Sequence, residues 1–280
     1  MPYGLGACRW LSGLVDTSLL ERMVAALGLR AIPQPLGGAT GAVWAVGDQV
    51  LRVGPRTRID KELAAAEAAS AVVPVPAVVD RVDLGDQTGL LLTRIAGVPA
   101  AEVADCSVAE AFRRGTSCGA LHRRLATVPA PAGVPPVDEA AVDGEAVNGE
   151  AVDGVAPVLL HLDLHPLNVL VDPSGQVVAL LDWANAAVGP AELELARTAS
   201  ILTADPQAVA WQQDARCRAL VEGWRQESGW DGVQDRARAW ALRFMLDDLS
   251  DRHSAEELRA IRAALEELEQ RLDEDVGPSR

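Results

Sequence analysis

Three residues whose side-chain oxygens could bind a cation occur within a short stretch in the middle of the sequence. Asp163 and Asn168 share one short polar stretch, and Asp182 follows two apolar runs that are separated by turn residues 172–175. This pattern predicts two short strands joined as a hairpin, which returns Asp182 to the neighbourhood of Asn168. Carboxylate and amide oxygens suit Mg²⁺ bound to a polyphosphate. The spacing therefore predicts a magnesium site.

The same stretch permits a second interpretation, in which a hydrolase binds a transition metal. His161, Asp163 and His165 alternate in the sequence, so they would face one way on an extended strand, as metal ligands must. Pro166 and the lack of further clustered His or Cys residues weigh against this alternative.

A glycine-rich turn lies upstream, between two apolar segments, and a strand is expected at residues 49–53 after the Gly47-Asp48 turn. Glycines allow backbone N–H groups to approach a phosphate without a side chain between them. When the loop is taken alone, an unliganded glycine-rich hairpin turn is the commoner explanation. The following strand and the downstream Asp-Asn pair favour nucleotide binding, with the candidate residues Gly37, Gly38, Thr40 and Gly41.

The order His161, Asp163, Asn168, two strands and Asp182 resembles the catalytic and metal loops of the aminoglycoside phosphotransferase family, antibiotic kinases related to protein kinases and choline kinases. The resemblance implies that Asp163 is the catalytic base and that His161 braces the loop. It also implies that Asn168 and Asp182 bind Mg²⁺ and that ATP or GTP is the phosphate donor. Leu162 stands where many of these antibiotic kinases have glycine.

The resemblance assigns further positions to the nucleotide site. Arg52 takes the place of the phosphate-pairing lysine, and Glu67 that of the glutamate that pairs with it, with Glu62 as the other candidate. Thr93 and Ile95 belong to the expected hinge, where backbone groups would bind the adenine edge. Downstream, Glu194 resembles an anchor near the active site, in the place of the family's aspartate.

The implied fold is of the α+β class, a two-lobed protein-kinase-like fold. A small antiparallel-sheet lobe would comprise residues 1–96 and bind the nucleotide, and a mainly helical catalytic lobe would comprise residues 97–280. Apolar periodicity and end signals predict the principal elements. Helices are expected near residues 16–28, 59–71, 107–127, 189–200, 206–227, 234–249 and 255–272, and strands near 77–82 and 89–95. The acidic low-complexity repeat within residues 128–157 predicts a mobile loop.

The formal net charge of −15 argues against nucleic acids and anionic membranes as partners, because these are bound largely through Lys and Arg. A cationic small-molecule acceptor fits this charge better. In antibiotic kinases, acidic residues of late helices bind the ammonium groups of the substrate. Asp247, Asp248 and Asp251 are the candidates here, and a solvated acidic helix face is the alternative.

The sequence contains no apolar run of about 18 residues and no basic segment followed by an apolar one at its start. We therefore expect neither a membrane span nor a secretory signal, and we expect a cytoplasmic protein. The four cysteines are scattered without a Cys-x-x-Cys pair, which predicts reduced thiols. The sequence does not indicate an oligomeric state.

These observations predict an antibiotic phosphotransferase. It would transfer the γ-phosphate of ATP or GTP to a hydroxyl of a cationic antibiotic, such as an aminoglycoside or a basic cyclic peptide, and confer resistance. A kinase of an endogenous small molecule, such as choline or a sugar, is the first alternative. A non-catalytic nucleotide-binding module is the second, and Arg52 in place of lysine is its only support.

Overall fold

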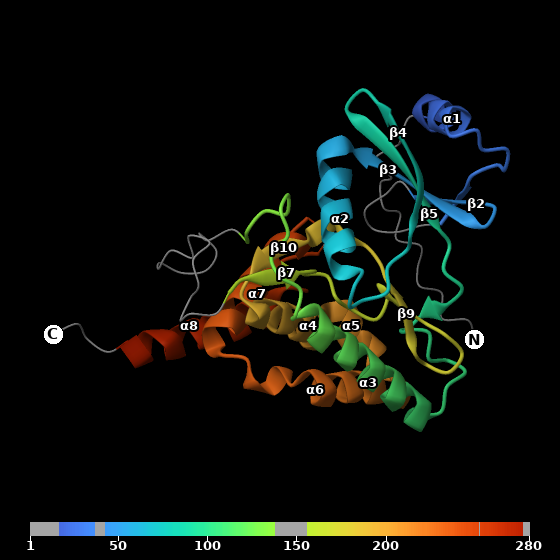
Figure 1. Ribbon diagram of the computed structural model, residues 1–280. Coiled ribbons are helices and arrows are strands. Elements are labelled where there is room, and N and C mark those ends of the chain that lie inside the picture. Colours follow the sequence, from blue (N-terminus) through green and yellow to red (C-terminus); the bar gives the residue numbers. More distant parts are fainter. Residues whose placement is uncertain (1–16, 37–42, 138–155, 252, 277–280) are drawn as a thin grey trace. The chain divides into compact units, whose positions relative to one another are not determined.

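The computed structural model describes residues 17–36, 43–137, 156–251 and 253–276, which form two compact units (Figure 1). The first unit contains the residues up to Lys61 and Pro76–Ile95, and the second contains Glu62–Val75 and the chain from Ala96 onward. The chain thus leaves the first unit next to the expected lobe boundary. Residues Glu62–Val75, expected in the first lobe, group with the second unit.

A five-stranded antiparallel sheet forms the first unit, in the strand order β1-β2-β3-β5-β4. Helix α1 packs against it, and its Met23 is buried with Leu51, Val53 and Leu91. The predicted strands and the predicted helix near residues 16–28 are confirmed. The bounds are α1 Thr17–Ala26, β1 Gln34–Pro35, β2 Val43–Val46, β3 Gln49–Pro55, β4 Val78–Leu84 and β5 Gln87–Thr93.

The second unit is mainly helical, as predicted, and helix α2 (Arg56–Ala69) runs into it from the first unit. The C-terminal half of α2 contributes Ala65 and Ala69 to the core of the second unit. The remaining helices are α3 Val108–Leu125, α4 Ala191–Ala204, α5 Pro206–Trp211, α6 Ala215–Ser228, α7 Asp235–Leu249 and α8 Arg259–Val276. None of the helices in the described ranges has the length and apolarity that a bilayer span requires.

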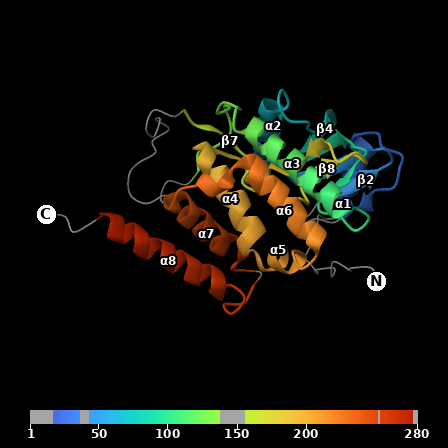
Figure 2. The same cartoon turned by 90° about the horizontal axis from the view of Figure 1, so that it is seen from below.

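Helices α3 and α6 lie side by side in both views (Figures 1 and 2) and approach closely because glycines occupy their crossing. A Cβ atom on Gly115 would lie 1.9 Å from the Leu220 carbonyl oxygen, and one on Gly223 would lie 2.2 Å from the Phe112 carbonyl oxygen. Ser107 begins α3 in a capping box with Glu110. Both helices contribute buried side chains to the core of the second unit.

The prediction of one helix near residues 206–227 is wrong, because the structure has two helices there. Helix α5 ends at Trp211, and the side chain of Asp214 accepts the backbone N–H of Arg216 to start α6. Asp214 is therefore an N-cap, a role for which aspartate is strongly preferred over an interior helical position. Its carboxylate also pairs with the Arg216 guanidinium.

Short strands position the polar stretch that contains Asp163. Strand β7 (Val158–Leu160) pairs with β10 (Ala187–Gly189) just before this stretch, and β8 (Val169–Val171) follows it. Strand β8 pairs with β9 (Val177–Leu180) and with the short β6 (Val98–Pro99). The β8–β9 pair confirms the predicted hairpin.

The cysteines within the described residues are free thiols, as predicted. Cys118 and Cys217 are buried, and burial raises the pKa of Cys118 to about 12. These thiols are therefore inert core residues. Cys8 and most of the predicted mobile loop, residues 138–155, lie outside the described residues.

Candidate active site

The loop between β7 and β8 brings three predicted polar residues together. Nδ2 of Asn168 donates to Asp163 Oδ2 at 3.0 Å, and Nε2 of His165 lies 3.4 Å from Asp163 Oδ1. The backbone N–H of Leu167 donates to His165 Nδ1 at 3.3 Å, which orients the ring beside Asp163. Both carboxylate oxygens of Asp163 thus have a donor.

The environment of Asp163 favours its ionised form. Burial alone would raise its pKa, but the hydrogen bond and charge of His165, together with the charge of Arg197, outweigh burial and hold the pKa of Asp163 below its usual value. A carboxylate in this state can accept a proton from a neighbouring hydroxyl group. Asp163 therefore has the charge state that a general base requires.

His161 is buried beneath this loop and serves as a brace. Its Nε2 lies 2.9 Å from the Leu181 carbonyl oxygen, and its Nδ1 accepts the backbone N–H of Asp163 at 3.3 Å. A carbonyl only accepts, so Nε2 carries the hydrogen and the ring is neutral; burial lowers the pKa of His161 accordingly. The ring also packs edge-on against Trp183 at a centroid distance of 4.7 Å.

These contacts argue against the transition-metal interpretation. Both ring nitrogens of His161 are occupied by the backbone, so neither is available to a metal. In the part of the chain that the structure describes, no group of three or more His, Cys, Asp or Glu residues is arranged to hold a metal. A magnesium ion needs fewer protein ligands, because phosphates and waters complete its shell.

Asn168 and Asp182 both lie at the open end of the β8–β9 hairpin, Asn168 directly before β8 and Asp182 two residues after β9. The backbone N–H of Leu181 donates to the Asn168 carbonyl oxygen at 2.8 Å, so the two residues lie across the hairpin from each other. Asp182 has a left-handed backbone, with φ of 60°, immediately before the short 3-10 turn Trp183–Asn185. Because Nδ2 of Asn168 donates to Asp163, its amide oxygen is left for a cation. An amide and a carboxylate oxygen form a donor set that fits Mg²⁺.

Glu194, in the first turn of α4, holds the start of the loop between β7 and β8. Its Oε2 accepts the backbone N–H of His161 and, at 2.9 Å, that of Leu162. The Glu194 side chain is buried, and burial raises its pKa to about 7, although the two backbone N–H groups oppose this shift. The sequence similarity to an anchoring aspartate predicted this position but not its partners.

Arg197 is a site residue that the sequence reasoning missed. It is 2% exposed, its Nε donates to the Leu162 carbonyl oxygen at 3.3 Å, and its guanidinium pairs with Asp248 of α7 at 3.3 Å. The only signal in the sequence is the spacing from Glu194 to Arg197, which puts both on one face of a helix. That spacing is common on solvent-exposed helices and does not identify a site.

A small cavity of about 110 Å³ adjoins Asp163. Of the three predicted acceptor-binding residues, Asp248 lines this cavity, whereas Asp247 and Asp251 are exposed outside its lining. The structure therefore brings only Asp248 together with the candidate base. The full lining is Asp163, His165, Arg197, Ile201, Asp205, Met245, Asp248 and Leu249.

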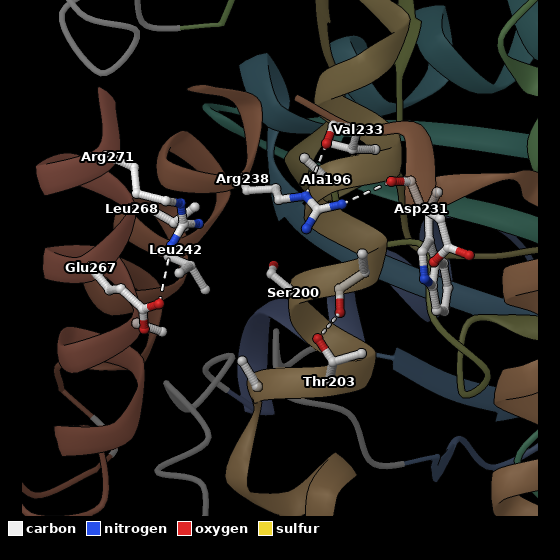
Figure 3. Close-up of a pocket in the computed structure, with 14 residues that line it drawn as sticks. Ala196, Ser200, Thr203, Asp231, Val233, Arg238, Leu242, Glu267, Leu268 and Arg271 are labelled. Carbon is white, nitrogen blue, oxygen red and sulfur yellow. Dashed lines mark hydrogen bonds and ion pairs between the residues drawn. The ribbon is translucent and has the colours of Figure 1, made fainter. Parts of the chain in front are cut away.

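A larger cavity of about 440 Å³ lies between α4, α7 and α8 (Figure 3). Ser200 and Thr203 of α4 line it, and both hydroxyls donate to backbone carbonyls of their own helix. Arg238 and Arg271 at its edge also have protein partners. None of the predicted site residues in the described ranges lines this cavity, so volume alone does not identify the active site.

The nucleotide-site candidates of the first unit and of α2 differ in their surroundings. Arg52 lies on β3, opposite Val43 of β2 and Leu90 of β5. Thr93 ends β5, and its Oγ1 accepts the backbone N–H of Ala77 at 2.9 Å. Ile95 follows and is half-buried. The glycine-rich candidates, Gly37, Gly38, Thr40 and Gly41, lie outside the described residues.

The two glutamates of α2 differ sharply in burial. Glu62 is 6% exposed, whereas Glu67 is exposed. A carboxylate is rarely buried without a charged or hydrogen-bonding partner. Glu62 therefore needs such a partner within the protein, whereas the exposed Glu67 does not.

The sequence matches the model of one known family. The model of the family described as "Phosphotransferase enzyme family" matches residues 31–154 and 147–234. No curated protein matches the sequence significantly.

Several solved structures share the fold. The structure of aminoglycoside phosphotransferase APH(3'')-Id from Streptomyces rimosus in complex with ADP and streptomycin has a TM-score of 0.57 at 16% identity, covering 81% of this chain and 97% of that one. A choline/ethanolamine kinase family protein from Mesorhizobium loti has a TM-score of 0.53 at 16% identity, covering 91% and 93%. The GDP complex of a mutant aminoglycoside 2'-phosphotransferase IIIa has a TM-score of 0.53 at 15% identity, covering 94% and 99%. These likenesses show the predicted kinase-like α+β fold.

Proposed function

The chain belongs to the phosphotransferase enzyme family, and on this premise we propose that it transfers the γ-phosphate of ATP or GTP to a hydroxyl group of a cationic small molecule. An aminoglycoside or a basic cyclic peptide is the leading acceptor. The observation that carries this proposal is the position of the Asp163 carboxylate, which is hydrogen-bonded to Asn168 and lines a cavity, in surroundings that hold its pKa below the usual value.

Asp163 would act on the acceptor hydroxyl. One carboxylate oxygen accepts the hydroxyl proton as the hydroxyl oxygen bonds to the γ-phosphorus, and the nucleoside diphosphate leaves with the electrons of the broken P–O bond. His165 and Asn168 hold the carboxylate through hydrogen bonds to its two oxygens, which fixes its orientation. Orientation matters because phosphoryl transfer depends mainly on positioning and charge neutralisation.

Asn168 and Asp182 would hold Mg²⁺ through the amide oxygen of one and the carboxylate of the other. The ion, when bound, neutralises charge on the phosphates of the nucleotide. The residues themselves supply the placement, because the β8–β9 hairpin joins them through the Leu181 to Asn168 hydrogen bond. His161 holds the residue before Asp182 through its hydrogen bond to the Leu181 carbonyl oxygen.

The nucleotide would be held by residues of the first unit. Gly37, Gly38, Thr40 and Gly41 would offer backbone N–H groups to the phosphates, and Arg52 would pair with them. Backbone groups of Thr93 and Ile95 would meet the base. We assign the supporting carboxylate to Glu62 in preference to Glu67, since Glu62 is buried and Glu67 is exposed.

The acceptor would approach the acidic cavity beside Asp163. Its lining holds the carboxylates of Asp163, Asp205 and Asp248 and the guanidinium of Arg197, with which Asp248 pairs. The proposal of a cationic acceptor therefore rests on Asp163 and Asp205 and on the net charge of −15. The S. rimosus structure contains streptomycin, a cationic acceptor class, which supports this choice. A resistance role for the protein follows from phosphorylation of such an antibiotic.

A kinase of an endogenous alcohol is the second candidate, and the similarity to a choline/ethanolamine kinase family protein favours it. One experiment separates the two candidates. The protein is incubated with MgATP or MgGTP and a panel of aminoglycosides, basic cyclic peptides, choline, ethanolamine and sugars, and products are identified by mass spectrometry. A phosphorylated antibiotic supports the first candidate, a phosphorylated choline or sugar supports the second, and nucleotide binding without any phosphorylated product contradicts both.

A further inference from the structure

We propose that Arg197 is a positioning residue, which fixes the backbone of Leu162 and thereby the peptide that carries Asp163, and that Asp248 is its counter-ion. The inference deepens the proposed function and rests on it in one respect, the assignment of Asp163 as the base. Its structural content stands on contacts among the described residues of the second unit.

Leu162 has an uncommon backbone conformation. Its φ of 59° lies in the left-handed region, which residues other than glycine rarely adopt. Its side chain is buried, at 2% exposed, so relaxation of the backbone would also move a core residue. Such a conformation persists only where surrounding contacts determine it strongly.

Two side chains of α4, one helical turn apart, hold the two polar backbone groups of Leu162. Glu194 accepts its N–H at 2.9 Å, and Arg197 donates to its carbonyl oxygen at 3.3 Å. Glu194 and Arg197 therefore fix Leu162 from both ends. The left-handed conformation of a leucine is stabilised here by two side chains on one helix, Glu194 and Arg197.

The contact with Arg197 also orients the next peptide. The Leu162 carbonyl and the Asp163 N–H belong to the same planar peptide unit, and that N–H donates to His161 Nδ1 at 3.3 Å. Arg197 holds one side of this peptide and His161 holds the other. Because the Asp163 side chain departs from the end of this peptide, rotation of the peptide would displace the carboxylate.

Helix α7 holds the guanidinium in place. Asp248 Oδ2 lies 3.3 Å from it, and the Phe244 ring centroid lies 4.7 Å from its central carbon. Phe244 and Asp248 are one turn apart and so present one face to Arg197. A buried cation needs a counter-charge, and Asp248 supplies it. This assigns Asp248 to Arg197, where the sequence assigned it to the acceptor.

Leu162 and Arg197 depend on each other in this account. Glycine adopts positive φ without steric cost, so a glycine at position 162 would need less support from Arg197. The two substitutions Leu162→Gly and Arg197→Met, made singly and together, test this dependence. These variants form a double-mutant cycle. The cavity left by removing the leucine side chain is present with and without Arg197, so its energetic cost cancels in the cycle.

The measurements are kcat and KM for the best acceptor and the hydrogen-exchange rate of the Asp163 amide. We expect Arg197→Met to lower kcat by about tenfold or more, since small misplacements of reacting groups have effects of this size, with KM for nucleotide little changed. We expect the same variant to speed exchange of the Asp163 amide. Adding Leu162→Gly should reduce the effect of Arg197→Met on kcat. Equal effects of Arg197→Met in both backgrounds would overturn the proposal.

Three further variants keep the test decisive. Arg236→Met removes an exposed arginine from α7 and should leave kcat and amide exchange unchanged. Arg197→Lys keeps the charge if the methionine variant does not fold, and it should show a smaller loss of kcat. Asp248→Asn should lower kcat without raising KM for the acceptor, whereas a raised acceptor KM with normal kcat would return Asp248 to the acceptor. If the wild type transfers no phosphate, the proposed function fails, and unchanged Asp163 exchange in Arg197→Met separately overturns the positioning role.

Discussion

The Asn168 side chain donates through Nδ2 to the Asp163 carboxylate at 3.0 Å and to the Asp163 carbonyl oxygen at 2.9 Å. One residue thus orients the candidate base with its amide nitrogen, and the proposed function assigns its amide oxygen to the magnesium ion. A carboxylate at position 168 would offer an equivalent oxygen but no donor. We therefore expect the amide to matter beside Asp163.

Asn168→Asp should lower activity while preserving shape. Two carboxylates would then face each other, and the like charge would raise the pKa of Asp163. We expect kcat at neutral pH to fall by about tenfold or more, and the acidic limb of the pH–rate profile to move to higher pH. Gln213→Glu adds the same charge at an exposed position and should change neither quantity. An unshifted acidic limb would contradict the pairing.

Asp182→Asn should weaken the binding of the magnesium nucleotide. Asp182 supplies the only full negative charge in the proposed donor set, and an amide binds Mg²⁺ more weakly than a carboxylate. Calorimetric titration should show an affinity for MgADP that is lower by about tenfold, which corresponds to about 1.4 kcal/mol. Affinity for ADP in the presence of a chelator should be unchanged. An equal loss with and without magnesium would argue against the metal role.

Glu194 should make the stability of the protein depend on pH. Burial raises its pKa from 4.5 to about 7, so between these values the folded protein binds more protons at this site than the unfolded chain does. Glu194 therefore contributes up to about 3 kcal/mol to the free energy of unfolding. This contribution is fully present below pH 4.5 and is lost as the pH rises through about 7.

The comparison with Glu194→Gln isolates this contribution, because glutamine does not titrate. The free energy of unfolding of each protein is measured in urea from pH 4.5 to 8. The stability of the wild type relative to the variant should decrease as the pH rises. The buried histidines titrate in both proteins and cancel. A difference that stays constant across this range would refute the raised pKa of Glu194.

Gly223→Ala should destabilise the second unit. A Cβ atom there would lie 2.2 Å from the Phe112 carbonyl oxygen, so α3 and α6 would have to separate. Overpacking of this kind costs about 1–3 kcal/mol or more in the free energy of unfolding. Gly232→Ala, where no heavy atom lies within 4 Å, is the matched control and should have little effect. Equal stabilities of the two variants would contradict the close crossing.

The hairpin beside the candidate base could be predicted from the sequence because the interactions that form it are local. Asn168 and Asp182 flank a hairpin whose two strands follow from their apolar residues and the turn between them, and the structure has that hairpin. The kinase-like fold followed from the resemblance, and the structural comparisons show it. The local apolar pattern thus predicted the hairpin, and the order of the motifs predicted the fold that contains it.

Tertiary contacts account for what the sequence did not reveal. Arg197 is remote from Leu162 and from Asp248 along the chain, so nothing local distinguishes it from the other arginines. The division between α5 and α6 depends on the choice of Asp214 as a cap over a helix interior. The choice between Glu62 and Glu67 depends on burial, which the sequence of an alanine-rich helix does not show.

The turnover of Asp163→Ala tests the central claim most directly. With wild-type and variant proteins of matched thermal stability, single-acceptor kinetics should show kcat lower by about 10²–10⁴-fold, the usual contribution of a general base. The dissociation constant for MgATP should change little, because Asn168 and Asp182 are retained. Turnover close to that of the wild type, with nucleotide bound normally, would contradict the assignment of Asp163 as the catalytic base.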